Sequence, residues 1–176
     1  MSASEPEATQ DYSNKNGTRT FAGWRVSGSD SVPLGAPGAL LGALALAGVI
    51  LCVAATFTPV IEIVVLTARK ATYTGMDRHS VALLLIGAFA LAVILGAARG
   101  AQPAMLALAA CGVAVLLIAI LGDLPHLDDA GVWPRADSFE DARAQAGTGY
   151  FLETAAGVLL FASGVGMLLV ARGRRS

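Results

Sequence analysis

The polar residues between two apolar runs are the first candidates for chemistry in this sequence. Asp123, His126, Asp128 and Asp129 lie close together in a turn-rich segment. Carboxylate and imidazole groups are ordinary ligands of divalent cations. Their spacing matches neither a calcium loop nor a zinc motif, and Pro125 interrupts the segment. We therefore expect Asp123 to end a helix at the membrane interface and the others to be solvated, with a metal site as the alternative.

Glu153 is a second candidate because it lies about one turn inside the last apolar run. An acid near a helix N-terminus is favoured by the helix dipole, and it can also pair with a basic residue such as Arg78. We expect Arg78, His79 and Glu153 to form an outer polar cluster. A catalytic acid or base role for Glu153, together with Asp123 or His79, is the alternative.

Sequence motifs of known catalytic chemistry are absent. Cys52 and Cys111 lie deep in apolar runs without a CxxC partner, which favours a packing role and excludes a thiol–disulfide oxidoreductase. The sequence contains no phosphate-binding loop, cofactor fingerprint or serine or cysteine triad pattern. We therefore expect no cofactor and favour a protein that is not an enzyme.

The elements that must position these residues are membrane spans. The chain is 55% hydrophobic and only 14% charged, against about a quarter charged in soluble domains. Four runs lack charged residues altogether and approach the roughly 18–20 residues that cross a bilayer. These runs are 34–57, 80–98, 100–122 and 154–171. A net charge of −1 argues against a nucleic-acid partner, and the bilayer is the expected surrounding.

We predict an all-α membrane protein, a four-transmembrane-helix bundle with a short outer β-hairpin or extended loop. The transmembrane domain is 34–171, with spans at about 34–57, 80–98, 103–122 and 150–171. Residues 1–33 are predicted to be a disordered cytoplasmic tail because they are polar and lack apolar periodicity. Residues 172–176 form a basic cytoplasmic tail.

The connections carry their own signals. A first helix continuing to Thr67 would overrun the bilayer, and Pro59 favours a break, so 60–74 is predicted to be a hairpin or extended segment with "ARK" near the turn. Asp77 or Ser80 is the expected N-cap of the second span. The stretch "SFEDARAQA" (138–146) has the pattern of a capped helical turn on the outer surface.

Basic residues predict a multi-pass protein of the plasma membrane with both termini in the cytoplasm. With an even number of spans, most arginines near span ends fall on one side, which the positive-inside rule makes cytoplasmic. Three basic residues of the first outer loop run against the rule. The arginines on the predicted cytoplasmic side are Arg19, Arg25, Arg99, Arg172, Arg174 and Arg175. The basic residues on the predicted outer side are Arg69, Lys70 and Arg78.

Small residues at four-residue spacing predict close helix packing, within the chain or against a partner, since they let helix backbones approach in lipid. The span interiors carry no charged residue or histidine, which argues against a proton-coupled transporter or pump. The packing positions are Gly38, Gly42, Ala88, Ala92, Gly96, Ala110, Ala114, Ala162 and Gly166.

Three phrases of the sequence resemble a known group. "DRHSVALLLIGAFAL", "ILGDLP" and "SFEDARAQAGTGYFLETAAGVLL" are similar to segments of small, uncharacterised four-span integral membrane proteins of high-GC actinobacteria. The resemblance covers roughly 34–171 and implies the four-span topology but no activity. Some members have a longer first outer loop with cysteines, which this chain lacks.

Three functions follow from these features. The favoured one is a structural or accessory membrane protein that acts through helix–helix association with a partner or a second copy. The first alternative is a ligand- or cation-sensing membrane protein that uses the acidic outer loop 123–149. The second is a membrane enzyme acting on lipid or cell-wall precursors.

Overall fold

The computed structural model describes residues 20–21, 24–25, 35–65, 68–127 and 142–174. The chain divides into two units, Met1–Asp30 and Ser31–Ser176. In the first unit, β1 (Thr20–Phe21) and β2 (Trp24–Arg25) pair antiparallel. The rest of the predicted disordered tail lies outside the described residues.

The second unit is mainly helical, as the composition predicts. Its long helices are α1 (Gly35–Phe57), α3 (Ala82–Ala98), α4 (Gln102–Leu117) and α5 (Thr148–Gly173). Helix α4 continues as a π-helical turn, η1 (Ile118–Asp123), and a 3-10 turn, η2 (Leu124–His126).

Among the described residues, three helical segments are long and apolar enough to cross a membrane. They are Gly35–Phe57, Gln102–His126 and Thr148–Gly173. Helix α3 is also apolar but has 17 residues. These lengths support the predicted membrane location, since about 20 apolar residues cross the hydrocarbon core.

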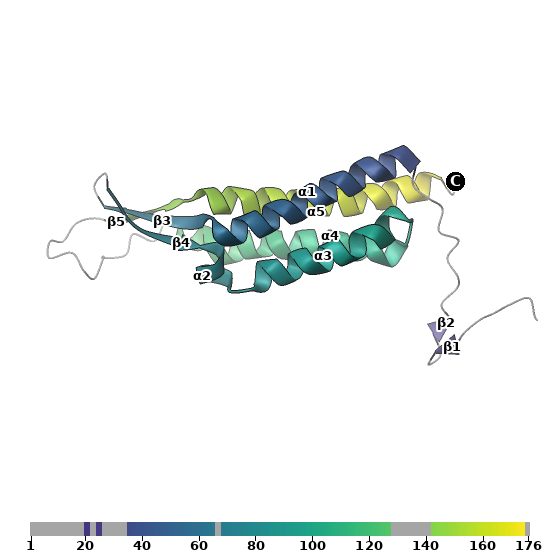
Figure 1. Ribbon diagram of the computed structural model, residues 1–176, viewed down its shortest axis with the longest axis horizontal. Coiled ribbons are helices and arrows are strands. Elements are labelled where there is room, and N and C mark those ends of the chain that lie inside the picture. Colours follow the sequence, from purple (N-terminus) through teal and green to yellow (C-terminus); the bar gives the residue numbers. More distant parts are fainter. Residues whose placement is uncertain (1–19, 22–23, 26–34, 66–67, 128–141, 175–176) are drawn as a thin grey trace, which may run out of the picture. The chain divides into compact units, whose positions relative to one another are not determined.

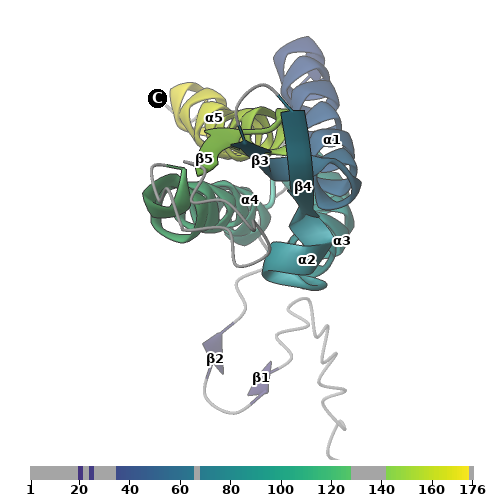
Figure 2. The same ribbon diagram turned by 90° about the vertical axis from the view of Figure 1, so that its left-hand side faces the viewer.

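The four long helices pack side by side, with α5 against α1 and α4, and α3 against α1 and α4 (Figures 1 and 2). Leu83, Met105, Leu108, Leu160 and Met167 fill the shared core. Many large apolar side chains point outward instead. Leu121 is 68% exposed, and Leu85 and Leu95 are each 65% exposed. In water such surfaces would drive aggregation, whereas lipid tails solvate them.

Glycines bring α4 and α5 into direct backbone contact. A Cβ on Gly112 would lie 2.3 Å from the Phe161 backbone nitrogen, and one on Gly164 would lie 2.5 Å from that of Ala109. A Cβ on Gly157 would meet the Leu116 side chain at 2.8 Å. Sequence spacing did not select these three glycines, although they make the tightest helix contact in the described structure.

The predicted packing residues divide into two groups. Gly38 is buried, a Cβ on Gly42 would lie 4.0 Å from Met167, and those on Gly96 and Gly166 would lie 3.1 Å from Ala104 and 2.9 Å from Leu41. Ala114 is partly buried. The others lie exposed on the helix surface rather than in an interface of this chain: Ala88, Ala92, Ala110 and Ala162.

A three-stranded antiparallel sheet follows the helices at one end (Figures 1 and 2). Strand β3 (Pro59–Val65) pairs with β4 (Ala68–Thr74) on one side and with β5 (Ala142–Ala146) on the other. The predicted hairpin is confirmed, and "ARK" lies near its turn at the start of β4, where Ala68 pairs with Val65.

The helical turn predicted over 138–146 is wrong for residues 142–146, which form β5. Its backbone pairs with β3, Ile61 opposite Ala146 and Val65 opposite Ala142. A local capping pattern cannot reveal a strand partner some 80 residues away. This long-range pairing overrides the helix signal.

The short helix α2 (Gly75–His79) places the first site residues. Thr74 is its N-cap and forms a capping box with Asp77. The prediction of Asp77 or Ser80 as N-cap of the second span is wrong, because α3 begins at Ala82 and its N-cap is Val81. Ser80 has a φ of 51° and separates α2 from α3. This break turns α2 away from the α3 axis.

Candidate functional site

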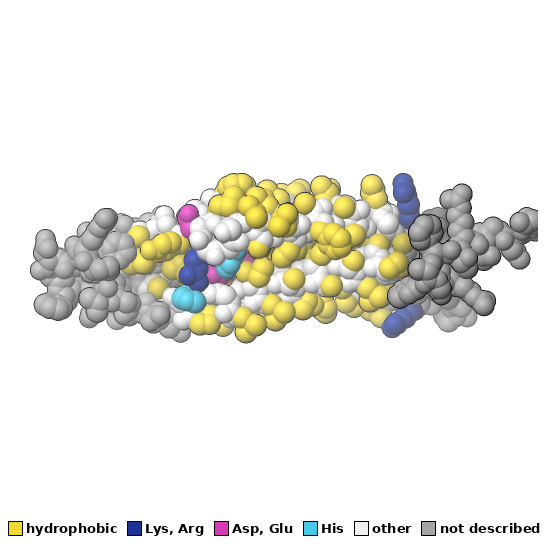
Figure 3. Space-filling view, turned by 90° about the horizontal axis from the view of Figure 1, so that it is seen from below, with side chains coloured by type: hydrophobic (Ala, Val, Ile, Leu, Met, Phe, Trp, Pro, Cys, Tyr) yellow, Lys and Arg dark blue, Asp and Glu magenta, His cyan; other side chains and the backbone are white. Residues whose placement is uncertain are grey.

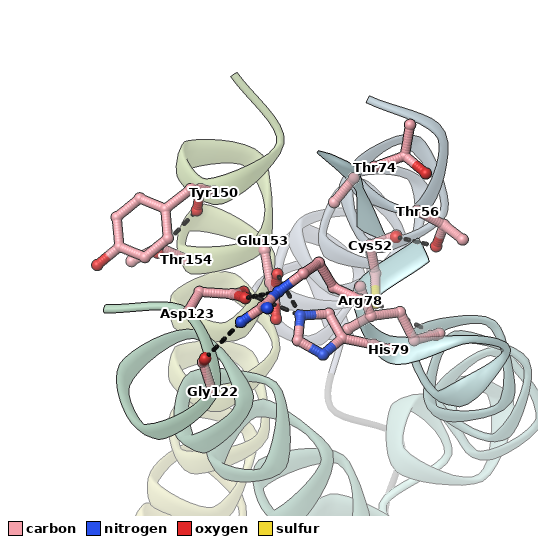
Figure 4. Close-up of polar contacts among 12 residues, drawn as sticks. Cys52, Thr56, Thr74, Arg78, His79, Gly122, Asp123, Tyr150, Glu153 and Thr154 are labelled. Atoms are coloured by element: carbon pink, nitrogen blue, oxygen red, sulfur yellow. Dashed lines mark hydrogen bonds and ion pairs between the residues drawn. The ribbon is translucent and has the colours of Figure 1, made fainter. Parts of the chain in front are cut away.

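Three acid and imidazole side chains meet where α2, the end of η1 and the start of α5 come together (Figure 4). His79 Nε2 lies 2.9 Å from Asp123 Oδ2 and 3.9 Å from Glu153 Oε2. One ligand atom from each residue lies within 4.8 Å of the others. The three groups therefore face a common point.

Each residue is held there by its own local structure. The capping box fixes α2 after β4, and a Cβ on Gly75 would lie 2.7 Å from the Ala55 carbonyl oxygen, so α2 sits directly on α1. The beginning of α5 is pinned in the same way, because a Cβ on Gly149 would lie 2.8 Å from the Pro59 carbonyl oxygen. Asp123 is the last residue of the π-helical turn, a feature that is often found at functional sites.

Arg78 joins the cluster from the same short helix. Its Nε lies 3.4 Å from Asp123 Oδ1, and its Nη2 donates to the Gly122 carbonyl oxygen at 3.0 Å. Asp123 thus receives His79 on one carboxylate oxygen and Arg78 on the other. These bonds tie α2 to the end of the α4 segment.

The two carboxyl groups are equally buried but differently partnered. Asp123 and Glu153 are both 0% exposed. Asp123 accepts the bonds described above, whereas both carboxyl oxygens of Glu153 lack a hydrogen-bond partner among the described residues. A buried polar group without a partner costs free energy. Glu153 is therefore the group in this site that a bound species would satisfy.

The neighbours of His79 favour its protonated form. The hydrogen bond to Asp123 raises the pKa of His79 above its ordinary value of 6.5, against the opposing effects of burial and of Arg78. Because a carboxylate only accepts hydrogen bonds, His79 Nε2 carries a proton in this arrangement. Protonated His79 and Arg78 thus place two cationic groups against the Asp123 side chain.

The arrangement has the donor set of a transition-metal site. In a tetrahedral zinc site with bonds of about 2.0–2.1 Å, the ligand atoms lie about 3.3 Å apart. The separations of His79 Nε2 from Asp123 (2.9 Å) and from Glu153 (3.9 Å) bracket that value. One imidazole and two carboxylates would leave a fourth position for water or another ligand.

The structure brings together only some of the candidate residues identified from the sequence. Arg78, His79 and Glu153 do lie in one polar cluster, in which Arg78 and His79 contact Asp123 and His79 also lies near Glu153. Asp123 lies with them rather than with His126, whose exposed ring donates from Nδ1 to the Gly122 carbonyl oxygen at 2.9 Å. Asp128 and Asp129 lie outside the described residues.

Asp123 ends the helical segment as expected, since it is the last residue of η1, and its side chain is fully buried. The reason for this burial is the contact with α2, which is distant in sequence and brings two cationic donors to a carboxylate that ends a helix. Cys52 lies on α1 near the cluster, and its Sγ donates to the Leu83 carbonyl oxygen at 3.4 Å. This bond is consistent with a packing role.

The cluster lies at the sheet end of the helices, outside the main apolar belt. On the face seen in Figure 3, acidic, basic and histidine side chains gather at that end, and further basic side chains appear at the opposite end. Apolar side chains occupy the surface between them. Such a distribution is typical of a protein whose polar ends lie at the two surfaces of a bilayer.

No family model, curated protein or solved structure matches this chain. The resemblance to small four-span proteins of actinobacteria therefore stays a prediction.

Proposed function

We propose that the chain is a four-span protein of the plasma membrane, a transmembrane bundle in which α3 is the fourth span. Helix α3 packs against α1 and α4, and its 17 residues reach the lower end of the length, about 17–25 residues, that crosses a bilayer. Arg99 follows α3 and Arg172 lies in the last turn of α5. The positive-inside rule places this end, and both termini, in the cytoplasm. The sheet and the His79–Asp123–Glu153 cluster then lie at the outer boundary.

We further propose that the protein binds a divalent transition-metal ion at His79, Asp123 and Glu153. The observation that carries this proposal is Glu153, a fully buried carboxyl group whose two oxygens have no hydrogen-bond partner within the described structure. Its Oε2 lies 3.9 Å from His79 Nε2. A metal ion bound there would satisfy Glu153 and take the place of the proton on His79.

The donor types favour zinc over calcium or magnesium. Calcium takes six to eight oxygen ligands and magnesium demands six in octahedral geometry, whereas this cluster offers one nitrogen and two carboxylates. Zinc accepts this mixture and needs only four ligands. The cation-sensing alternative is thus moved from the acidic loop 123–149 to a site that shares only Asp123 with it.

Calorimetric titration of the full chain in mild detergent tests this assignment. Zinc is expected to bind with one ion per chain, with calcium and magnesium far weaker at the same concentrations. Glu153→Gln should weaken zinc binding by at least 10-fold, because an amide oxygen is a poor substitute for a charged ligand. Glu62→Gln provides the same chemical change in β3, outside the cluster, and should leave binding unchanged.

A second pair of variants separates the buried cluster from the loop. Asp128→Asn/Asp129→Asn and His126→Gln should both retain zinc binding. If they abolish it while Glu153→Gln binds zinc normally, the loop is the metal site and the assignment to the cluster is wrong.

A second candidate function is helix–helix association in the membrane, favoured by an apolar groove on the lipid-facing surface. The groove lies between α3 and α4 and has a volume of about 500 Å³. Small residues of α4 form one wall, which allows another helix to approach closely. Its lining is Leu85, Ile86, Phe89, Ala107, Ala110, Cys111 and Ala114.

Cross-linking in native membranes tests the groove. The substitution Ala110→Leu should reduce the yield of a cross-linked homodimer or partner complex severalfold. Ala162→Leu, at an exposed position of α5, should leave the yield unchanged. A chain that is monomeric in membranes and co-purifies with no other protein would remove this candidate.

A further inference from the structure

A second polar feature lies beside the metal-binding cluster, in a pocket under the sheet. The pocket has a volume of about 240 Å³, and its lining comes from five elements: Ile61, Ile63, Tyr73, Arg78, His126 and Ala144. Ile61 and Ile63 alternate along β3 and so share one face, with Tyr73 opposite Ile61 and Ala144 opposite Ile63. One face of the sheet thus forms an apolar wall.

The other wall carries hydrogen-bond donors. Arg78 and His126 both donate to the Gly122 carbonyl oxygen, at 3.0 Å and 2.9 Å. That shared acceptor holds the guanidinium and the imidazole next to each other. Arg78 uses Nε and Nη2 in the bonds to Asp123 and Gly122, which leaves Nη1 without a hydrogen-bond partner in the described part of the chain.

The donor set fits an anion rather than a cation. Guanidinium offers five N–H donors in a fixed plane and accepts none, and it recognises phosphate oxygens well. The Nδ1–H of His126 bonds Gly122, so Nε2 is the ring atom left to face a ligand, and it donates to an oxyanion in the imidazolium form. Tyr73 adds a phenol group. Asp123 neutralises part of the Arg78 charge, so the pocket suits a single oxyanion held by several hydrogen bonds.

We propose that this pocket binds a phosphate oxyanion, with Arg78, His126 and Tyr73 as donors and any apolar part of the ligand against Ile61 and Ile63. Two sources supply this chemistry at an outer membrane boundary, the headgroup of an anionic phospholipid and free inorganic phosphate. The proposal does not require a metal ion at Glu153, because none of the three donors is a ligand in the cation site.

Binding is measured on the full chain in mild detergent with EDTA present. The probes are inorganic phosphate and short-chain phosphatidic acid, each titrated while the thermal midpoint is followed. We expect phosphatidic acid to raise the midpoint in a saturable way. A response to phosphate equal to that for phosphatidic acid identifies free phosphate as the ligand, and a response to phosphatidic acid alone identifies a lipid headgroup.

Variants test the location without disturbing Arg78, which also holds Asp123. His126→Ala removes one donor at an exposed position and should weaken binding about 10-fold. Ala144→Phe on the edge strand β5 fills the pocket and should abolish binding. Thr72→Phe places the same ring on the opposite face of the sheet, since Thr72 pairs with Glu62, and should bind like the unchanged chain.

The metal site and the pocket are separated by Glu153→Gln, which should keep full phosphatidic acid binding even though it loses zinc. Binding that requires zinc, or that disappears in Glu153→Gln, would assign the anion to the metal and overturn the pocket. Equal affinity of Ala144→Phe and the unchanged chain would also overturn it, as would the absence of a response to both probes.

Discussion

Two substitutions that each replace a carboxyl group by an amide should differ in their effect on the stability of the metal-free protein. Asp123 and Glu153 are both fully buried and belong to the same cluster. Asp123→Asn removes the carboxylate that pairs with His79 and Arg78, whereas Glu153→Gln replaces a buried carboxyl group that has no hydrogen-bond partner in the described structure. We therefore expect Asp123→Asn to destabilise the protein and Glu153→Gln to leave its stability unchanged or increased.

The magnitude follows from the burial of the partners. Removing one member of a buried ion pair costs about 3–5 kcal/mol. The side chains of His79 and Arg78 retain 11% and 25% exposure, so water compensates them in part and we expect the low end, about 3 kcal/mol. For Glu153→Gln the range runs from no change to a gain of about 1 kcal/mol.

The assay uses the two cysteines of the chain. Cys52 and Cys111 are buried, so a thiol-reactive fluorogenic dye reports unfolding in detergent as they become exposed. With saturating zinc, Glu153→Gln should become less stable than the unchanged chain. Zinc at about 100 times its Kd adds about 2.7 kcal/mol to the free energy of unfolding of the unchanged chain and little to that of Glu153→Gln. Equal losses for the two variants without metal would refute the distinction between a partnered and an unpartnered carboxylate.

Further predictions concern packing, pH and metal removal. Gly112→Leu should destabilise the protein by about 3 kcal/mol or more because the new side chain meets the α5 backbone, whereas Val113→Leu on the exposed face should have little effect in the same dye assay. Without metal, the contribution of protonated His79 to the free energy of unfolding is fully present below a pH of about 6.5 and is lost as the pH rises through its raised folded pKa. The thermal midpoint should therefore fall more between pH 6 and 9 in the unchanged chain than in His79→Gln. With zinc the trend should reverse, since protons compete with the metal for His79, and EDTA should restore the metal-free behaviour.

Composition and the long apolar runs were enough to predict a membrane protein. Long runs without charge imply helices in lipid because every backbone hydrogen bond must be satisfied within the segment. The interruption at Pro59 and the β-branched residues after it indicated the hairpin. Residues at the polar ends of these runs, Arg78, His79 and Glu153, were recognisable because charged groups at such boundaries are few.

Tertiary structure alone decided how those residues meet and how the helices pack. The break at Ser80 turns α2 toward the end of α4, and this contact draws Asp123 away from the acidic loop into a buried cluster. The strand β5 forms because β3 offers it an open edge, although its sequence has a helical capping pattern. Gly112 and Gly164 became interface residues because a specific face of α4 meets α5. Each of these outcomes depends on contacts between segments that are far apart in the chain, and such contacts leave no local pattern in the sequence.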